Sequence, residues 1–87
     1  MFSTAALLPL VAKLGEYLRS AGEHAKRAAS AGSAVAPDVL AVALEREMAT
    51  WKPVIGGREV LDAETRRACA RFLAGVAVNV VVGRKEH

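Results

Sequence analysis

Apolar side chains recur at spacings of three and four residues along most of the chain, and this period indicates helices. In the first third the apolar positions are Leu7, Val11, Leu14, Leu18, Ala21, Ala25 and Ala28. Such spacing forms a seam that packs lengthwise against another helix. Pro9 suits a first turn, so we expect the helix to start near Leu8. Gly22 weakens its middle, and residues 8–31 are therefore one helix or two helices joined by a bend.

A second helix is predicted between two prolines. The segment 30–36 contains a glycine and two serines, which indicates a helix stop and a turn. Pro37 is suited to the first position of the next helix. The residue before a proline avoids helical geometry, so Lys52 and Pro53 end it. Its expected core face consists of Leu40, Leu44, Met48 and Trp51.

A Gly-Gly pair interrupts the stretch that follows. Residues 54–61 read VIGGREVL, with short apolar pairs on both sides of Gly56 and Gly57. This pattern predicts either a small β-hairpin or an irregular loop packed on the helices. Asp62 is a suitable N-cap for the last helix.

The last helix is amphipathic only in its first half. One predicted face carries Thr65, Cys69, Phe72, Leu73, Val76 and Val80. Arg67 and Arg71 lie opposite, but beyond Arg71 the opposite face is also apolar, with Ala74, Val78 and Val82. A helix that is apolar on every side is buried on every side. We therefore expect it to be the central element of the fold, or Val78 and Val82 to meet another chain. The β-branched run 76–82 leaves a strand as the alternative.

These elements predict an all-α fold, a small bundle of about four helices with one long loop at residues 52–61. With 87 residues, the chain has room for a single helical domain, residues 1–87. About a fifth of the residues are alanine, which forms helices well but supplies little volume. An alanine-rich core gains stability through close approach of helices, and we expect the chain to gain more by dimerising.

The composition of the chain indicates the cellular compartment in which the protein works. Cys69 is the single cysteine, which excludes an intrachain disulfide and favours a reducing compartment. The apolar run 72–82 is interrupted only by Asn79, and eleven residues are too few for a bilayer that requires about 20. We expect a cytoplasmic protein without a membrane partner.

Candidate chemistry is sparse. His24, His87 and Cys69 do not stand at metal-ligand spacing from one another. The predicted place of Cys69 on a core face makes it a small hydrophobe rather than a nucleophile. We therefore expect no catalytic, cofactor or metal site, and we predict that the chain is not an enzyme.

The helices carry more apolar surface than one small domain can bury, and the sequence shows no catalytic or metal-binding pattern. We therefore predict a protein–protein interaction module of the adaptor, recruitment or regulatory kind that self-associates through its apolar helix surfaces. The predicted partner-binding residues are Trp51, Arg67, Arg71, Val78 and Val82. The alternative is a small DNA-binding regulator that uses a face formed by Arg66, Arg67 and Arg71 to contact phosphates. The net charge of +3 is mild for that role, and Asp62 and Glu64 at the start of the helix would repel a phosphate backbone.

Overall fold

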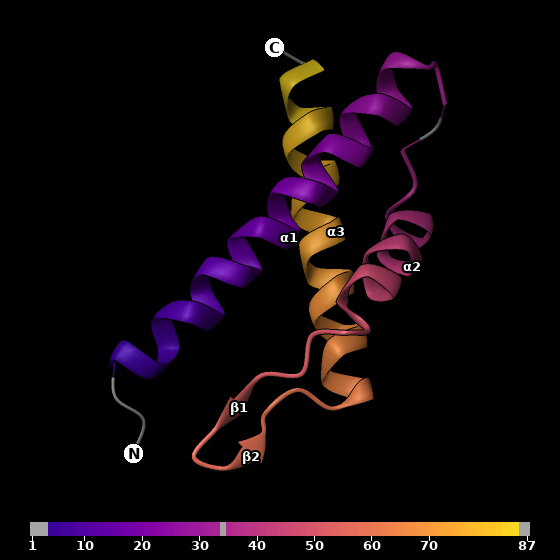
Figure 1. Cartoon of the computed structure of the whole chain (residues 1–87). Helices are drawn as coiled ribbons and strands as arrows, with labels where there is room; N and C mark the ends of the chain where they lie inside the picture. Colours follow the sequence, from indigo (N-terminus) through magenta and orange to yellow (C-terminus); the bar gives the residue numbers. More distant parts are fainter. Residues whose placement is uncertain (1–3, 34, 86–87) are drawn as a thin grey trace.

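The computed structural model describes residues 4–33 and 35–85, and His87 lies outside them. This part of the chain is mostly helical. The elements are α1 (Thr4–Ser30), α2 (Pro37–Met48), β1 (Val54–Ile55), β2 (Arg58–Glu59) and α3 (Ala63–Lys85). Figure 1 shows α1 crossing α3, α2 beside α3, and the hairpin projecting near the end where α3 begins. The described residues thus confirm a helical fold, but they form three helices where we predicted about four.

The difference in helix count comes from α1. This helix runs through Gly22 without interruption for 27 residues, so the two halves are one element. It also begins earlier than predicted, at Thr4, which places Pro9 inside the helix. Because Pro9 is only the sixth helical residue, its missing N–H removes a single hydrogen bond close to the start of the helix.

A glycine ends α1 where the sequence predicts a stop. The N–H of Ser33 donates to the carbonyl of Ala28 at 2.9 Å, and the N–H of Gly32 to that of Ala29 at 3.2 Å. Gly32 has a φ of 76°, the left-handed conformation that this helix ending requires. Two otherwise unpaired carbonyls at the end of α1 are thereby satisfied.

The Gly-Gly pair forms a β-hairpin, the first of the two predicted alternatives. Gly56 and Gly57 have φ values of 61° and 80°, and positive φ at both central residues is the requirement of a type I′ turn. Strands β1 and β2 pair antiparallel, with Val54 opposite Glu59. The hairpin occupies most of the predicted loop at 52–61.

The predicted cap of the last helix is confirmed. The Asp62 carboxylate accepts a hydrogen bond of 2.7 Å from the backbone N–H of Thr65. This hydrogen bond lowers the pKa of Asp62 below its ordinary value. Helix α3 then continues unbroken to Lys85, so residues 76–82 are helical and the strand alternative is wrong.

Helix α3 is the element on which the other two pack. Both α1 and α2 contact it more extensively than they contact each other. Leu40, Leu44 and Met48 of α2 are buried, as predicted from their spacing. The buried positions of α3 are Ala70, Leu73, Ala74, Ala77, Val78 and Val81.

The orientation of α3 differs from the predicted one. Phe72 and Val80, expected on the same face as Leu73, are 70% and 48% exposed. The side chains at the centre of the contact are instead alanines, and Ala70 and Ala74 are fully buried. Small side chains allow helices to approach closely, so the alanine face turns inward and Phe72 turns outward.

The seam of α1 packs on the core from Leu14 onward, and its start is exposed. Ala21 and Ala25 are buried against the core, whereas Val11 and Leu7 are 63% and 40% exposed. The start of α1, as far as Val11, therefore presents exposed apolar side chains.

We predict that a larger side chain at the alanine contact will weaken the fold. Ala74→Leu should lower the free energy of unfolding by about 1–3 kcal/mol, because the close-packed helices must separate to admit it. Ala68→Leu introduces the same side chain at an exposed position of α3 and should change stability by less than about 0.5 kcal/mol. Urea denaturation followed by circular dichroism measures both, and equal losses would contradict a close contact at Ala74.

Candidate interaction surface

Trp51 packs inside one end of the molecule. It follows α2 directly and lies against Tyr17 of α1, with ring centroids 5.4 Å apart and a tilt of 47° between the ring planes. Both rings pack on the buried core residues. The exposed part of Trp51 lines a hollow of about 250 Å³ beside Pro9 and Pro53. Much of this side chain is thus used in joining α1 to the segment after α2, and its role in partner binding stays a prediction.

The three arginines proposed for DNA binding do not share one free face. Arg66 Nη2 donates to the carbonyl of Trp51 at 3.3 Å and to that of Leu61 at 3.4 Å, so it fastens the hairpin segment to α3. Arg67 Nε lies 3.4 Å from a carboxylate oxygen of Glu45 on α2. The DNA-binding alternative gains no support from these placements.

Arg67 and Arg71 do come together, as their spacing predicts. They line one wall of a hollow of about 460 Å³ between α2 and α3. Asp38 and Glu45 line it as well, so acidic and basic groups balance within it. Its other two lining residues, Ala41 and Val42, are apolar.

The two valines predicted to meet a partner have different surroundings. Val78 is only 8% exposed and belongs to the core formed by the three helices. It is therefore used inside a single copy, which corrects its assignment as a surface residue. Val82 is 39% exposed and stays available.

The structure gathers a different apolar surface, which we call the α1–α3 face and define by Leu18, Gly22, Phe72, Val76 and Val80. All of these except Phe72 line a hollow of about 300 Å³ between α1 and α3. Phe72 lies one helical turn before Val76, on the same side of α3. Leu18 and Val80 are 37% and 48% exposed, so the surface is apolar and open.

Charged side chains border this face on the α1 side only. Arg19, Glu23 and Lys26 also line the hollow. Glu23 contacts Arg27 of the same helix at 4.0 Å, a weak surface ion pair. From Phe72 to Gly83, in contrast, α3 carries no charged residue. The face thus has a charged border and an uncharged floor.

A polar cluster joins α1 to α2 elsewhere. The Ser20 hydroxyl donates to the Glu47 carboxylate at 2.9 Å, and His24 Nε2 lies 3.0 Å from the same carboxylate. These contacts lower the pKa of Glu47 from its ordinary value of 4.5, and the hydrogen bond from His24 is the largest cause. Because Ser20 donates to Glu47 and not to His24, the histidine does not activate it as a nucleophile. The cluster clamps two helices.

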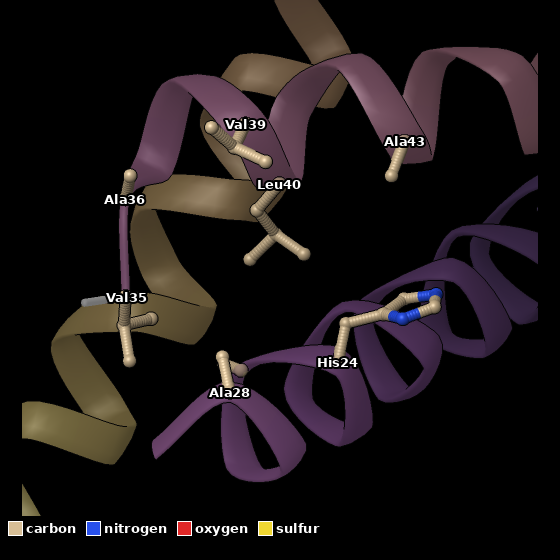
Figure 2. A pocket seen from close by; sticks show the side chains of 8 residues that line it. His24, Ala28, Val35, Ala36, Val39, Leu40 and Ala43 are labelled. Carbon is tan, nitrogen blue, oxygen red and sulfur yellow. The ribbon is translucent and has the colours of Figure 1, made fainter. Parts of the chain in front are cut away.

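His24 also stands at the edge of a second hollow, of about 210 Å³, between the end of α1 and the start of α2. Figure 2 shows Leu40 projecting between the two helices and the imidazole of His24 at one side. The other residues lining this hollow are apolar. It therefore offers one titratable group and no second one with which to carry out acid–base chemistry.

Cys69 is half-buried and packs against the core, as its predicted core position requires. Burial raises the pKa of its thiol, so little thiolate is present at neutral pH. In residues 4–33 and 35–85, no three His, Cys, Asp or Glu side chains gather where they can hold a metal ion. Among the described helices, none is long and apolar enough to cross a membrane.

Comparison with known proteins gives no further guide, because no family model, curated protein or solved structure matches the chain. The function must be inferred from the surfaces described above.

Sequence reasoning missed Phe72 and Val80 as surface residues because it placed the core face by the largest side chains. A usable signal was present in Ala70, Ala74 and Ala77, whose spacing of four and three defines the seam that is buried. In an alanine-rich chain, the small residues mark where helices touch.

We predict that the Glu47 clamp contributes stability that acid removes. The lowered pKa of Glu47 means that the folded state favours the carboxylate, so its contribution is present above about pH 4.5 and is lost as the pH falls below that value. Glu47→Gln should therefore lower the free energy of unfolding by about 1 kcal/mol at pH 7, a small loss because water screens the partly exposed contacts. The loss should be much smaller at pH 3, where protonation has already weakened the contacts of the natural carboxylate. Chemical denaturation at both pH values tests this. Glu59→Gln in the hairpin is the control, and an equal, pH-independent loss in both variants would contradict the clamp.

Proposed function

We propose that this protein is a non-enzymatic interaction module that self-associates through the α1–α3 face. The observation that carries the proposal is the 48% exposure of Val80 in a hollow of about 300 Å³ that Leu18 also lines. Phe72, which is 70% exposed, lies two helical turns before Val80 on α3. Exposed apolar side chains that are scattered singly are normal in soluble proteins, whereas contiguous ones mark interaction surfaces. On the α1–α3 face, Leu18 of α1 lines one hollow together with Val76 and Val80 of α3.

The uncharged stretch of α3 supports the same proposal. Twelve consecutive residues from Phe72 to Gly83 lack a charge, although only one side of this stretch is buried by α1 and α2. A helix that needs a single buried side normally carries charged residues on the other. A second buried side explains their absence, and association supplies it.

A second copy is the occupant that the proposal names, because an alanine-rich chain of 87 residues buries little volume on its own. In a two-fold dimer both copies use the same patch, so Phe72 and Val80 of each copy are removed from water by a single interface. The role that we assign to it is that of a small adaptor, recruitment or regulatory element.

Sedimentation equilibrium of the purified chain between about 1 and 200 μM tests the proposal. We expect a reversible dimer, and Phe72→Gln with Val80→Gln should raise its dissociation constant at least about tenfold by removing apolar anchors. Glutamine forms helices well, so the helical circular dichroism of this double variant should be retained.

Val39→Gln with Val42→Gln is the matched control. These two valines of α2 are 71% and 53% exposed, close to the values for Phe72 and Val80, but they lie outside the α1–α3 face. The control should associate like the natural chain. A strict monomer throughout the concentration range, or a loss of association in the α2 variant alone, would overturn the proposal.

A further inference from the structure

The border of the α1–α3 face carries a row of charges of alternating sign. Glu16, Arg19, Glu23 and Lys26 are all exposed. Their spacings of three, four and three residues place them along one side of α1. Read in either direction the spacings are the same, while the order of signs reverses.

In a two-fold dimer, this row is complementary to itself only when the two copies run antiparallel. In that arrangement Arg19 of one copy meets Glu23 of the other, and Glu16 meets Lys26, so that opposite charges meet at all four places. In a parallel two-fold dimer each charged residue would instead face the same residue of the other copy, so like charges would repel at all four positions. Like charges that face each other across an interface suppress the wrong geometry.

The four charged residues of the row do not pair with one another, although spacings of three and four residues on a helix would allow such pairs. Glu16 pairs with Lys13 at 3.3 Å, and Glu23 contacts Arg27 at 4.0 Å. Within residues 4–33 and 35–85, neither Arg19 nor Lys26 takes part in an ion pair. Two cations on the border of the apolar hollow are thus free to meet acidic groups from outside.

The backbone of α1 is accessible next to the same row. A Cβ atom added at Gly15 or at Gly22 would meet nothing within 4 Å. Glycine destabilises a helix interior relative to alanine, and packing within one copy does not require it at either position. Another helix lying across Gly22 would approach closely there, as helices do at small residues.

We propose that two copies associate through an antiparallel contact between their α1 helices, with Gly22 near the two-fold axis, the Glu16–Lys26 row pairing along one edge, and Leu18, Val76 and Val80 buried along the other. This inference deepens the proposed self-association and rests on it. It adds an orientation and a register, which the apolar surface alone does not give.

Charge reversal tests the register. In an R19E homodimer both Arg19–Glu23 contacts become repulsive, and the same holds for E23R. Each variant should therefore raise the dissociation constant about tenfold at low salt, and less at 1 M salt, where exposed charges are screened. The R19E/E23R double variant exchanges the two charges and should return to the dissociation constant of the natural chain.

An equimolar mixture of R19E and E23R separates a contact between copies from an effect within one helix. Each variant alone has like charges at positions 19 and 23, yet in a mixed dimer every negative side chain faces a positive one. We expect the mixture to form heterodimers with a dissociation constant close to that of the natural chain, measured with one variant carrying a fluorescent label. R58E and E59R on strand β2 make the same charge changes outside the interface and should leave association unchanged.

The outcomes are distinguishable. A natural chain that stays monomeric overturns the proposed function and this inference together. A dimer that is weakened by Phe72 and Val80 changes but is insensitive to R19E and E23R overturns only the antiparallel register. A dimer that the mixture does not restore, while each single variant is impaired, assigns the charges to the helix itself and also overturns the register.

Discussion

Close contact between alanine-lined helices is the constraint on which the rest of this structure depends. Ala21 of α1 is fully buried, as are Ala70 and Ala74 of α3. Because these side chains supply little volume, they allow the helices to approach closely, and larger side chains of α2 and α3 fill the rest of the core. Leu44 and Met48 of α2 are the largest side chains that are fully buried. The core is therefore narrow, and it is centred on α3.

A narrow core determines which surfaces are left over. Helix α3 has an uncharged half whose inner side is covered by α1 and α2, and its outer side keeps Phe72 exposed. The start of α1 leaves the seam residues Leu7 and Val11 exposed. The exposed apolar surfaces of α3 and α1 have the same cause: helices that touch through alanine bury little of their remaining apolar surface. Under the proposed function, the surplus is the working surface of the protein.

Local signals in the sequence predicted much of the fold, and they failed where packing decides. Residues whose backbone chemistry is specific gave correct predictions: Gly32 ends α1, Gly56 and Gly57 form the turn, and Asp62 caps α3. The rotation of α3 about its own axis was predicted wrongly, since it depends on which neighbour approaches and how closely. For the candidate surface, the sequence correctly indicated that apolar helix area exceeds what the core requires. It assigned Val78 to that surface and Phe72 to the core, the reverse of what the structure shows, because side-chain size was used in place of contact distance.

The proposed self-association requires the α1–α3 face to be buried between two copies in solution. Isotope-filtered nuclear Overhauser spectroscopy on a mixture of labelled and unlabelled chains detects contacts between copies alone. If the copies associate through this face, we expect intermolecular signals from the methyl groups of Leu18, Val76 and Val80 to the other copy, with none from Val39 or Val42. Signals that arise from the α2 valines instead, or no intermolecular signals in a sample shown to be dimeric by sedimentation, would contradict it.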